Sequence, residues 1–302
     1  MVLLSSLLCE AGRLAAEVHK KHLQQGFQVE QKSELESDVV TAADKETEHV
    51  LRDFFAQHLP DYNIFGEEFG AEYDGNGKII VIDPLDGTLS FTKRFPGFGT
   101  VIGVYEEKSN GTTNAAEEDK REEKGKVHCV AGYVSNTMKG ISYFGSLEEG
   151  FHRHGLEEII PKKAIYVGGA FSRNQQIADI LQRLLEEEFP NHPLVMHTQQ
   201  VTSRCRVYEG SWAVSLHSAL AWHDIAPDPL FGQLTGCRVT DLNGNPYEMF
   251  DAEQELKNYE SNERQQVYSK PILVCQPKYF DGILKVLERL EKETGRREGK
   301  WS

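Results

Sequence analysis

The sequence has little of what marks a secreted, membrane-spanning or nucleic-acid-binding protein. Its five cysteines are scattered without a Cys-x-x-Cys pair, and their odd number does not suit a disulfide framework. No apolar run approaches the roughly 18 residues of a membrane-spanning helix, and the apolar start lacks the basic residues of a signal peptide. Acidic residues outnumber basic ones by 47 to 33, and the formal net charge of −14 argues against nucleic acid polymers and anionic membranes as partners. We therefore expect a cytoplasmic protein with reduced thiols.

Hydrophobic periodicity divides the chain into two parts. The first part mixes helices and strands, with helices expected over 3–23 and 42–58 and strands over 79–82, 99–105, 127–134 and 141–144. The segment 106–126 is charged and almost free of large apolar residues, so we expect a solvated loop there. The second part alternates strands (164–168, 194–197, 212–216, 237–240, 272–275) with helices (174–188, 202–209, 279–293). Such alternation favours an α/β layer, so we predict an α+β part over 1–155 and an α/β part over 156–302.

The most informative motif follows the first buried strand, where the chain reads Asp83-Pro84-Leu85-Asp86-Gly87-Thr88. Proline fixes one backbone angle and glycine permits close approach, so the turn can aim both carboxylates at one point. Carboxylates suit hard divalent cations, and the free N–H groups of a helix that begins at Thr88 suit a phosphate. Asp-Pro-x-Asp-Gly is also an ordinary turn; the core strand before it and the helix start after it favour the functional interpretation.

Other acidic residues have both a structural and a functional interpretation. Glu67 and Glu68 lie between glycines in a pattern that is most often a solvated turn. Asp44, at the start of the second helix, and Asp224, just before a later one, are typical helix caps. They count as candidate functional residues only in combination with Asp83 and Asp86.

Together these residues resemble the inositol monophosphatase superfamily, the lithium-sensitive, magnesium-dependent phosphatases. Residues 83–88 match the family's Asp-Pro-(Ile/Leu)-Asp-Gly-Thr motif completely, 66–68 match its Gly-Glu-Glu turn, and 38–44 match its Asp-x-Val-Thr-x-x-Asp element. The resemblance is strong over about 38–105 and weaker after 160. It implies an αβαβα layered sandwich of the inositol monophosphatase and fructose-1,6-bisphosphatase type, and dimers are usual in the family.

The resemblance also implies a ligand set of two or three Mg²⁺ ions. One ion would be held by Glu67, Asp83 and the Leu85 carbonyl, and a second by Asp83, Asp86 and Asp224, while Glu67 could share a third. The expected reaction is hydrolysis of a small phosphorylated metabolite by a metal-activated water.

In the same resemblance, Thr88, polarised by Asp44, and Glu67 orient the attacking water, and the Gly87 and Thr88 amides hold phosphate oxygens. The second half departs from the family. The usual Trp before the last aspartate is replaced by His223, and His217 stands where inositol monophosphatases place a substrate-contacting glutamate. We expect both histidines near the substrate, although a supporting or packing role for His223 is the more common arrangement.

Several alternatives remain open at this point. A 3′(2′),5′-bisphosphate nucleotidase or an inositol polyphosphate 1-phosphatase is the alternative within the superfamily, favoured slightly by the Ala226-Pro227 pair. A catalytically inactive metal-binding homologue is a more distant one. A haloacid-dehalogenase-like phosphatase is excluded, because it needs a nucleophilic aspartate two residues before Asp86 and this chain has Pro84 there.

Overall fold

The computed structural model describes residues 3–31, 39–71, 73–107, 126–155, 163–169, 171, 174–196, 201–247, 250–251 and 270–295. Three predicted features lie wholly or partly outside these residues: the motif position Asp38, most of the charged segment 106–126, and the end of the strand expected at 194–197.

A large, mostly antiparallel sheet carries the first half of the chain. Its strand order is β4-β3-β5-β6-β7-β8-β9, and β14 also pairs with β7. Strand β5 runs parallel to β3 and antiparallel to β6. The strands are β3 (Asn63–Gly66), β4 (Gly70–Ala71), β5 (Lys78–Asp86), β6 (Gly99–Glu107), β7 (Lys126–Asn136), β8 (Ile141–Ser146), β9 (Gly150–His154) and β14 (Phe250–Asp251).

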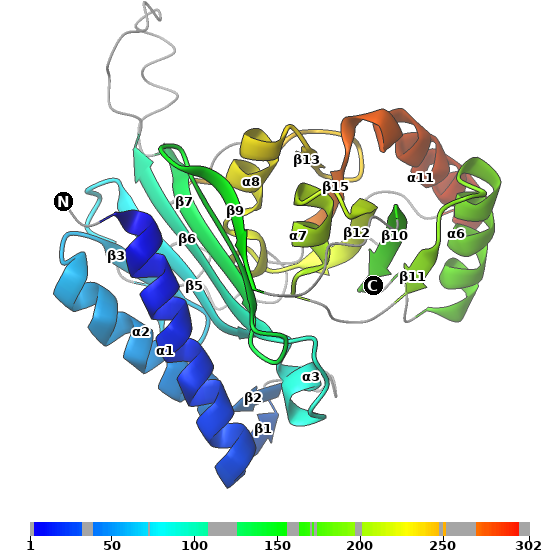
Figure 1. The fold of residues 1–302 in the computed structure, drawn as a ribbon. Helices are drawn as coiled ribbons and strands as arrows, with labels where there is room; N and C mark the ends of the chain where they lie inside the picture. Colours follow the sequence, from blue (N-terminus) through cyan, green and yellow to red (C-terminus); the bar gives the residue numbers. More distant parts are fainter. Residues whose placement is uncertain are drawn as a thin grey trace, which may run out of the picture.

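Two long helices, α1 (Leu4–Gln25) and α2 (Ala42–His58), cover one face of this sheet (Figure 1). Leucines, alanines and Phe55 on their inner sides form one core with Ile80 and Ile82 of β5. Helix α1 approaches β7 closely because Gly12 has no side chain; a Cβ there would lie 2.2 Å from the Tyr133 ring. Ahead of α2, a short pair of strands, β1 (Val29–Gln31) and β2 (Val39–Thr41), and after β5 the short helix α3 (Thr88–Thr92) complete this half.

The second half builds a smaller sheet with the order β11-β10-β12-β15-β13. Its strands are β10 (Ala164–Gly168), β11 (Leu194–Met196), β12 (Trp212–Leu220), β13 (Arg238–Thr240) and β15 (Lys270–Cys275). Helices α6 (Gln175–Glu188) and α11 (Phe280–Thr294), the latter preceded by the 3₁₀ turn η2 (Pro277–Tyr279), cover its outer face. Asn174 caps α6 by accepting a hydrogen bond from the Ile177 amide.

Between the two sheets lie α7 (Ser203–Tyr208) and α8 (Asp228–Thr235), as Figure 1 shows. The 3₁₀ turn η1 (His223–Ile225) precedes α8 and contacts β5 and β6 of the large sheet. Their apolar side chains join both sheets in one core that includes Cys205, Ile225 and Phe231. The layers thus run helices, large sheet, helices, small sheet, helices, and the predicted αβαβα sandwich is confirmed. No helix in the described part of the chain has the length and apolar character needed to cross a membrane.

The elements differ from the sequence prediction in instructive places. Strand β9, an edge strand paired with β8, was not expected, because its residues other than Phe151 are glycine, histidine or arginine and it is partly exposed. Strand β5 continues past its apolar run through Pro84 to Asp86. The sheets change between His154 and Ala164, near the expected boundary, but β14 returns to pair with β7 of the large sheet. The division at 155 therefore stays a prediction.

Candidate functional site

The end of β5 presents the two aspartates of the predicted motif. Its pairing with β6 shifts register between Asp83 and Asp86, as at a β-bulge. Pro84 lies inside this irregularity, where a missing N–H costs least because the ladder is already interrupted. The Asp83 Oδ1 atom accepts a hydrogen bond of 2.9 Å from the Leu85 amide, which fixes the direction of its carboxylate.

A buried histidine anchors the same turn from the side of α1. His19 Nε2 lies 3.0 Å from the Pro84 carbonyl oxygen and its Nδ1 lies 2.9 Å from Thr137 Oγ1. Burial lowers the pKa of His19 to about 3, so the ring is neutral. It donates from Nε2 to Pro84 and accepts from Thr137, while Thr100 Oγ1 also donates to the Pro84 carbonyl at 3.1 Å. The sequence analysis did not single out His19, which carries no local motif.

Glu67 lies on a turn whose backbone amides are hydrogen-bonded to a second glutamate, Glu48. Glu48 of α2 is fully buried, and its carboxylate accepts hydrogen bonds from the Glu68 amide at 2.7 Å and the Phe69 amide at 3.2 Å. The glycine at position 66 is required by this contact, because a Cβ there would lie 1.9 Å from Glu48 Oε1. Sequence reasoning missed Glu48; its only signal was an acidic residue at a position that helical spacing assigns to the buried side of α2.

Asp224 reaches the site from the other half of the molecule on η1. Its Oδ2 atom accepts a hydrogen bond of 2.8 Å from the Ala221 amide, and its backbone carbonyl accepts one of 2.5 Å from Arg204 Nη2. The expected capping role of Asp224 is not found, because neither η1 nor α8 has a side-chain cap and the Ala221 amide lies ahead of both.

A row of glycines lets this segment approach the large sheet. Gly103, Gly132 and Gly145 are paired across β6, β7 and β8. A Cβ on the middle glycine would lie 2.4 Å from the Pro227 Cβ, and one on Gly103 would lie 2.8 Å from the Ala226 Cβ. The absence of three side chains therefore sets how near Asp224 comes to β5.

These elements bring the predicted metal-binding carboxylates together. Asp83, Asp86 and Asp224 each offer an oxygen within 4.8 Å of the others, and Glu67, Asp83 and His223 form a second such group. Burial, then the charge of Glu67 and that of the other two aspartates, raises the pKa of Asp83 well above its ordinary value. Burial and Asp224 raise the pKa of Asp86 to about 8, although Arg204 opposes this shift. Converging oxygen donors with an excess of negative charge fit hard divalent cations.

Thr88 and Asp44 form a hydrogen-bonded pair beside this cluster. The Asp44 carboxylate has two tasks: its Oδ2 closes the capping box of α2 by accepting from Thr41 N and Oγ1, and its Oδ1 lies 3.0 Å from Thr88 Oγ1. Thr88 Oγ1 is also 3.1 Å from the Leu85 carbonyl, so that single hydroxyl proton has two acceptors. Burial raises the pKa of Asp44 to about 6. The capping and the functional interpretation of Asp44 are therefore compatible.

The two histidines expected near the substrate occupy different surroundings. His223 Nε2 is 3.8 Å from Glu67 Oε2 and 3.6 Å from Asp224 Oδ1, within the acidic cluster. His217 is buried on β12, with its Nε2 3.1 Å from the hydroxyls of both Ser203 and Ser215. Burial lowers the pKa of His217 well below its ordinary value, so it is a neutral ring within the small sheet. A substrate contact of either residue stays a prediction, as do the phosphate contacts of the amides at 87 and 88.

Arg204 and Asp228 form a buried ion pair behind the cluster that the sequence analysis also missed. Arg204 Nε donates to Asp228 Oδ2 at 2.7 Å, and Tyr208 OH donates to Asp228 Oδ1 at 2.7 Å. The same guanidinium holds the Asp224 backbone, so it links α7, η1 and α8. The available signal was Asp228, an acidic residue close to Ala226, Leu230 and Phe231, since a buried charge needs a partner.

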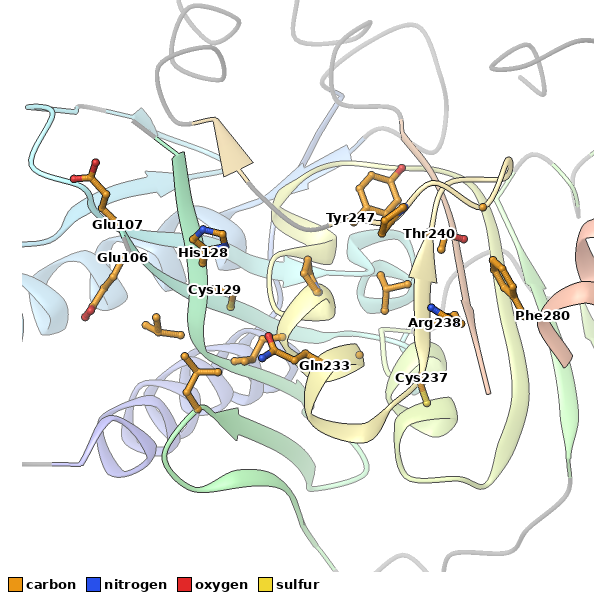
Figure 2. A pocket seen from close by; sticks show the side chains of 18 residues that line it. Glu106, Glu107, His128, Cys129, Gln233, Cys237, Arg238, Thr240, Tyr247 and Phe280 are labelled. Atoms are coloured by element: carbon orange, nitrogen blue, oxygen red, sulfur yellow. The ribbon is translucent and has the colours of Figure 1, made fainter. Parts of the chain in front are cut away.

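A cavity of about 830 Å³, drawn in Figure 2, is lined by none of the carboxylates of this cluster. It is lined by Glu106, His128, Gln233, Arg238 and Tyr247, among others. Glu106 pairs with the first residue of β5, whereas Asp83 pairs near the start of β6, so the cavity and the cluster lie toward opposite ends of these strands.

Comparison with known proteins places the chain in a family. A family model described as the inositol monophosphatase family matches residues 3–271. A histidinol-phosphatase of Chlorobaculum parvum is 35% identical over 95 residues, which are 32% of this chain and 35% of that protein. Inositol monophosphatase 1 of Pongo abelii is 25% identical over 221 residues, 70% of this chain and 74% of that protein. The match spans only about a third of the length of the first of these relatives.

Solved structures share the fold at low identity. An IMPase of Thermotoga maritima superposes with a TM-score of 0.68 at 18% identity and covers 94% of this chain and 96% of its own. A staphylococcal inositol monophosphatase, solved as an inhibitory complex soaked in LiCl, gives 0.68 at 17% identity and covers 93% of each chain.

Proposed function

The chain belongs to the inositol monophosphatase family, and from that premise we propose that it is a magnesium-dependent phosphomonoesterase acting on a small phosphorylated metabolite. The observation that carries the proposal is the meeting of Glu67, Asp83, Asp86 and Asp224 beside the Thr88–Asp44 pair. These residues come from both halves of the chain, and their shared position is hard to explain as packing, because burying like charges together costs free energy.

The carboxylates divide into two overlapping sets that share Asp83. Glu67 and Asp83, with the Leu85 carbonyl, would hold one Mg²⁺, and Asp83, Asp86 and Asp224 a second. Bound there, the ions would lower the pKa of a water and neutralise the charge that develops on the attacking and leaving oxygens.

The chain's own residues orient the reactants. When Asp44 is ionised, Thr88 donates its hydroxyl proton to Asp44 Oδ1, which leaves the Thr88 oxygen lone pairs to accept a hydrogen bond from the attacking water. Glu67, held by the turn on Glu48, would accept the other proton of that water. The Gly87 and Thr88 amides would bind phosphate oxygens. The turn needs glycine at position 87, because its φ is 86° and a side chain there would meet the Gly97 carbonyl.

The relatives do not indicate which substrate this chain accepts, since they include a histidinol-phosphatase, a fructose-1,6-bisphosphatase/inositol-1-monophosphatase and inositol monophosphatase 1. The experiment is phosphate release with Mg²⁺ and with EDTA over inositol phosphates, histidinol phosphate, sugar phosphates and 3′,5′-bisphosphonucleotides. We expect Mg²⁺-dependent release from at least one of them. No release from any substrate with any divalent ion would support the inactive homologue instead.

Lithium provides a second test. We expect LiCl to inhibit in a Mg²⁺-dependent manner that NaCl does not reproduce, because the Asp83, Asp86 and Asp224 set would accept Li⁺ in place of its Mg²⁺. A staphylococcal relative was solved as an inhibitory complex after soaking in LiCl. Superimposable LiCl and NaCl inhibition curves would mean that Asp83, Asp86 and Asp224 do not bind Li⁺ in place of Mg²⁺.

A further inference from the structure

His223 brings a nitrogen donor into a cluster otherwise made of oxygens. Its Nε2 atom lies 3.8 Å from Glu67 Oε2 and 3.6 Å from Asp224 Oδ1. One donor atom from each of Glu67, Asp83 and His223 lies within 4.8 Å of the other two. The imidazole is therefore placed beside the carboxylates that would hold the first ion.

The spacing of these atoms fits a shared ion. Ligand atoms about 2.1 Å from one octahedral ion lie about 3.0 Å apart at right angles and about 4.2 Å apart on opposite sides. The 3.8 Å between His223 Nε2 and Glu67 Oε2 lies between these two values, so a small movement of either side chain would bring both atoms to one ion. A direct hydrogen bond would need a much shorter separation, so these two atoms are not hydrogen-bonded to each other.

The backbone on both sides of His223 is held in place. The preceding Trp222 is 7% exposed and the following Ile225 is fully buried in the core between the sheets. The Ile225 amide donates to the Trp222 carbonyl at 3.1 Å, which closes η1 around the histidine. The His223 side chain itself is 17% exposed, so an ion entering from solvent can reach it.

The donor types select the ion. Carboxylates suit Mg²⁺, Ca²⁺ and Mn²⁺, whereas imidazole adds little for Mg²⁺ and suits transition metals. We propose that His223 Nε2 is a direct ligand of the ion held by Glu67 and Asp83, and that it biases this site toward a divalent transition metal such as Mn²⁺. This inference rests on the proposed metal-dependent phosphatase function, and it adds a ligand and a metal preference to it.

The first test needs no variant. Mn²⁺ is added below one equivalent to the metal-free protein, and electron spin echo envelope modulation is recorded on unlabelled protein and on protein with ¹⁵N-labelled histidine. A ligated imidazole gives ¹⁴N modulation that changes to the ¹⁵N pattern on labelling. Bound Mn²⁺ without histidine nitrogen modulation would overturn the proposal.

The second test measures selectivity. Kd values for Mn²⁺ and Mg²⁺ are determined by calorimetry for the wild type, for His223→Gln, and for the control His152→Gln, an exposed histidine on β9. We expect His223→Gln to reduce the preference for Mn²⁺ over Mg²⁺ by at least about tenfold, the lower end of what loss of even a ligand-orienting group costs. His152→Gln should leave the preference unchanged, and an unchanged preference in His223→Gln would contradict the assignment.

The outcomes separate this inference from the function on which it rests. Phosphate release with Mg²⁺, together with Mn²⁺ binding that shows no histidine nitrogen, would reject the ligand and keep the phosphatase. Histidine modulation without phosphate release from any substrate would keep the ligand and reject the phosphatase. Misfolding of His223→Gln would not affect the labelling experiment, which uses the wild-type protein, and absence of histidine nitrogen modulation there would still reject the proposal.

Discussion

Replacing Asp86 with asparagine should stabilise the metal-free protein while removing its response to Mg²⁺. Burial and the neighbouring Asp224 raise the pKa of Asp86 from 3.8 to about 8. Between these values the folded state keeps a proton that the unfolded chain has released, so the free energy of unfolding falls as pH rises. Four pKa units correspond to about 5–6 kcal/mol. Solvent reaches part of the Asp86 side chain, so we expect about 2–3 kcal/mol after screening.

The assay is urea unfolding in EDTA at several pH values, with and without added Mg²⁺. At pH 8 in EDTA, Asp86→Asn should be the more stable protein, and toward about pH 4, where unfolded aspartate is itself half protonated, the two should converge. Saturating Mg²⁺ should stabilise the wild type, by about 2.7 kcal/mol at one hundred times Kd, and the variant much less. The exposed Asp53→Asn on α2 serves as the control and should change neither quantity. A variant less stable than the wild type in EDTA at pH 8, or one equally stabilised by Mg²⁺, would refute the reasoning.

Three further substitutions test other parts of the site. Gly132→Ala places a Cβ 2.4 Å from that of Pro227; we expect a loss of about 1–3 kcal/mol in denaturant unfolding and weaker Mg²⁺ binding, whereas normal Mg²⁺ affinity would contradict the role of the glycine row. Arg204→Leu leaves the Asp228 charge unpaired and should cost about 3–5 kcal/mol; adding Asp228→Asn should recover most of this, and a double variant as unstable as the single one would argue against the pair. Thr88→Val should lower kcat by about 10²–10⁴-fold with little change in Tm, and near-native turnover would remove Thr88 from the proposed mechanism.

Local patterns predicted much of the fold correctly. The second helix was expected over 42–58 from its apolar spacing and the proline at 60, and the structure has it at Ala42–His58, where a capping box closes its first turn. The strand 164–168 was also placed correctly, by its continuous apolar run. Strand β9 escaped prediction because its residues other than Phe151 carry no apolar pattern.

The supporting residues of the site were not predictable in the same way. His19 is 65 residues from the Pro84 carbonyl that it contacts, and Glu48 is 20 residues from the Glu68 amide. No local motif marks His19, and the only sign of Glu48 is its position on the side of α2 that helical spacing assigns to the core. Their partners are set by how α1 and α2 pack on the large sheet.

The sequence by itself determined the chemistry of the β5 turn, because the residues from Asp83 to Thr88 are neighbours and their geometry follows from proline, glycine and a helix start. Only the tertiary structure decided whether Asp224 and His223 share that site. Their position depends on α7, η1 and α8 lying between two sheets, on the Arg204–Asp228 pair, and on glycines of three strands that align only when β6, β7 and β8 are in register. Contacts between residues far apart in the chain are products of packing, which a local pattern does not encode.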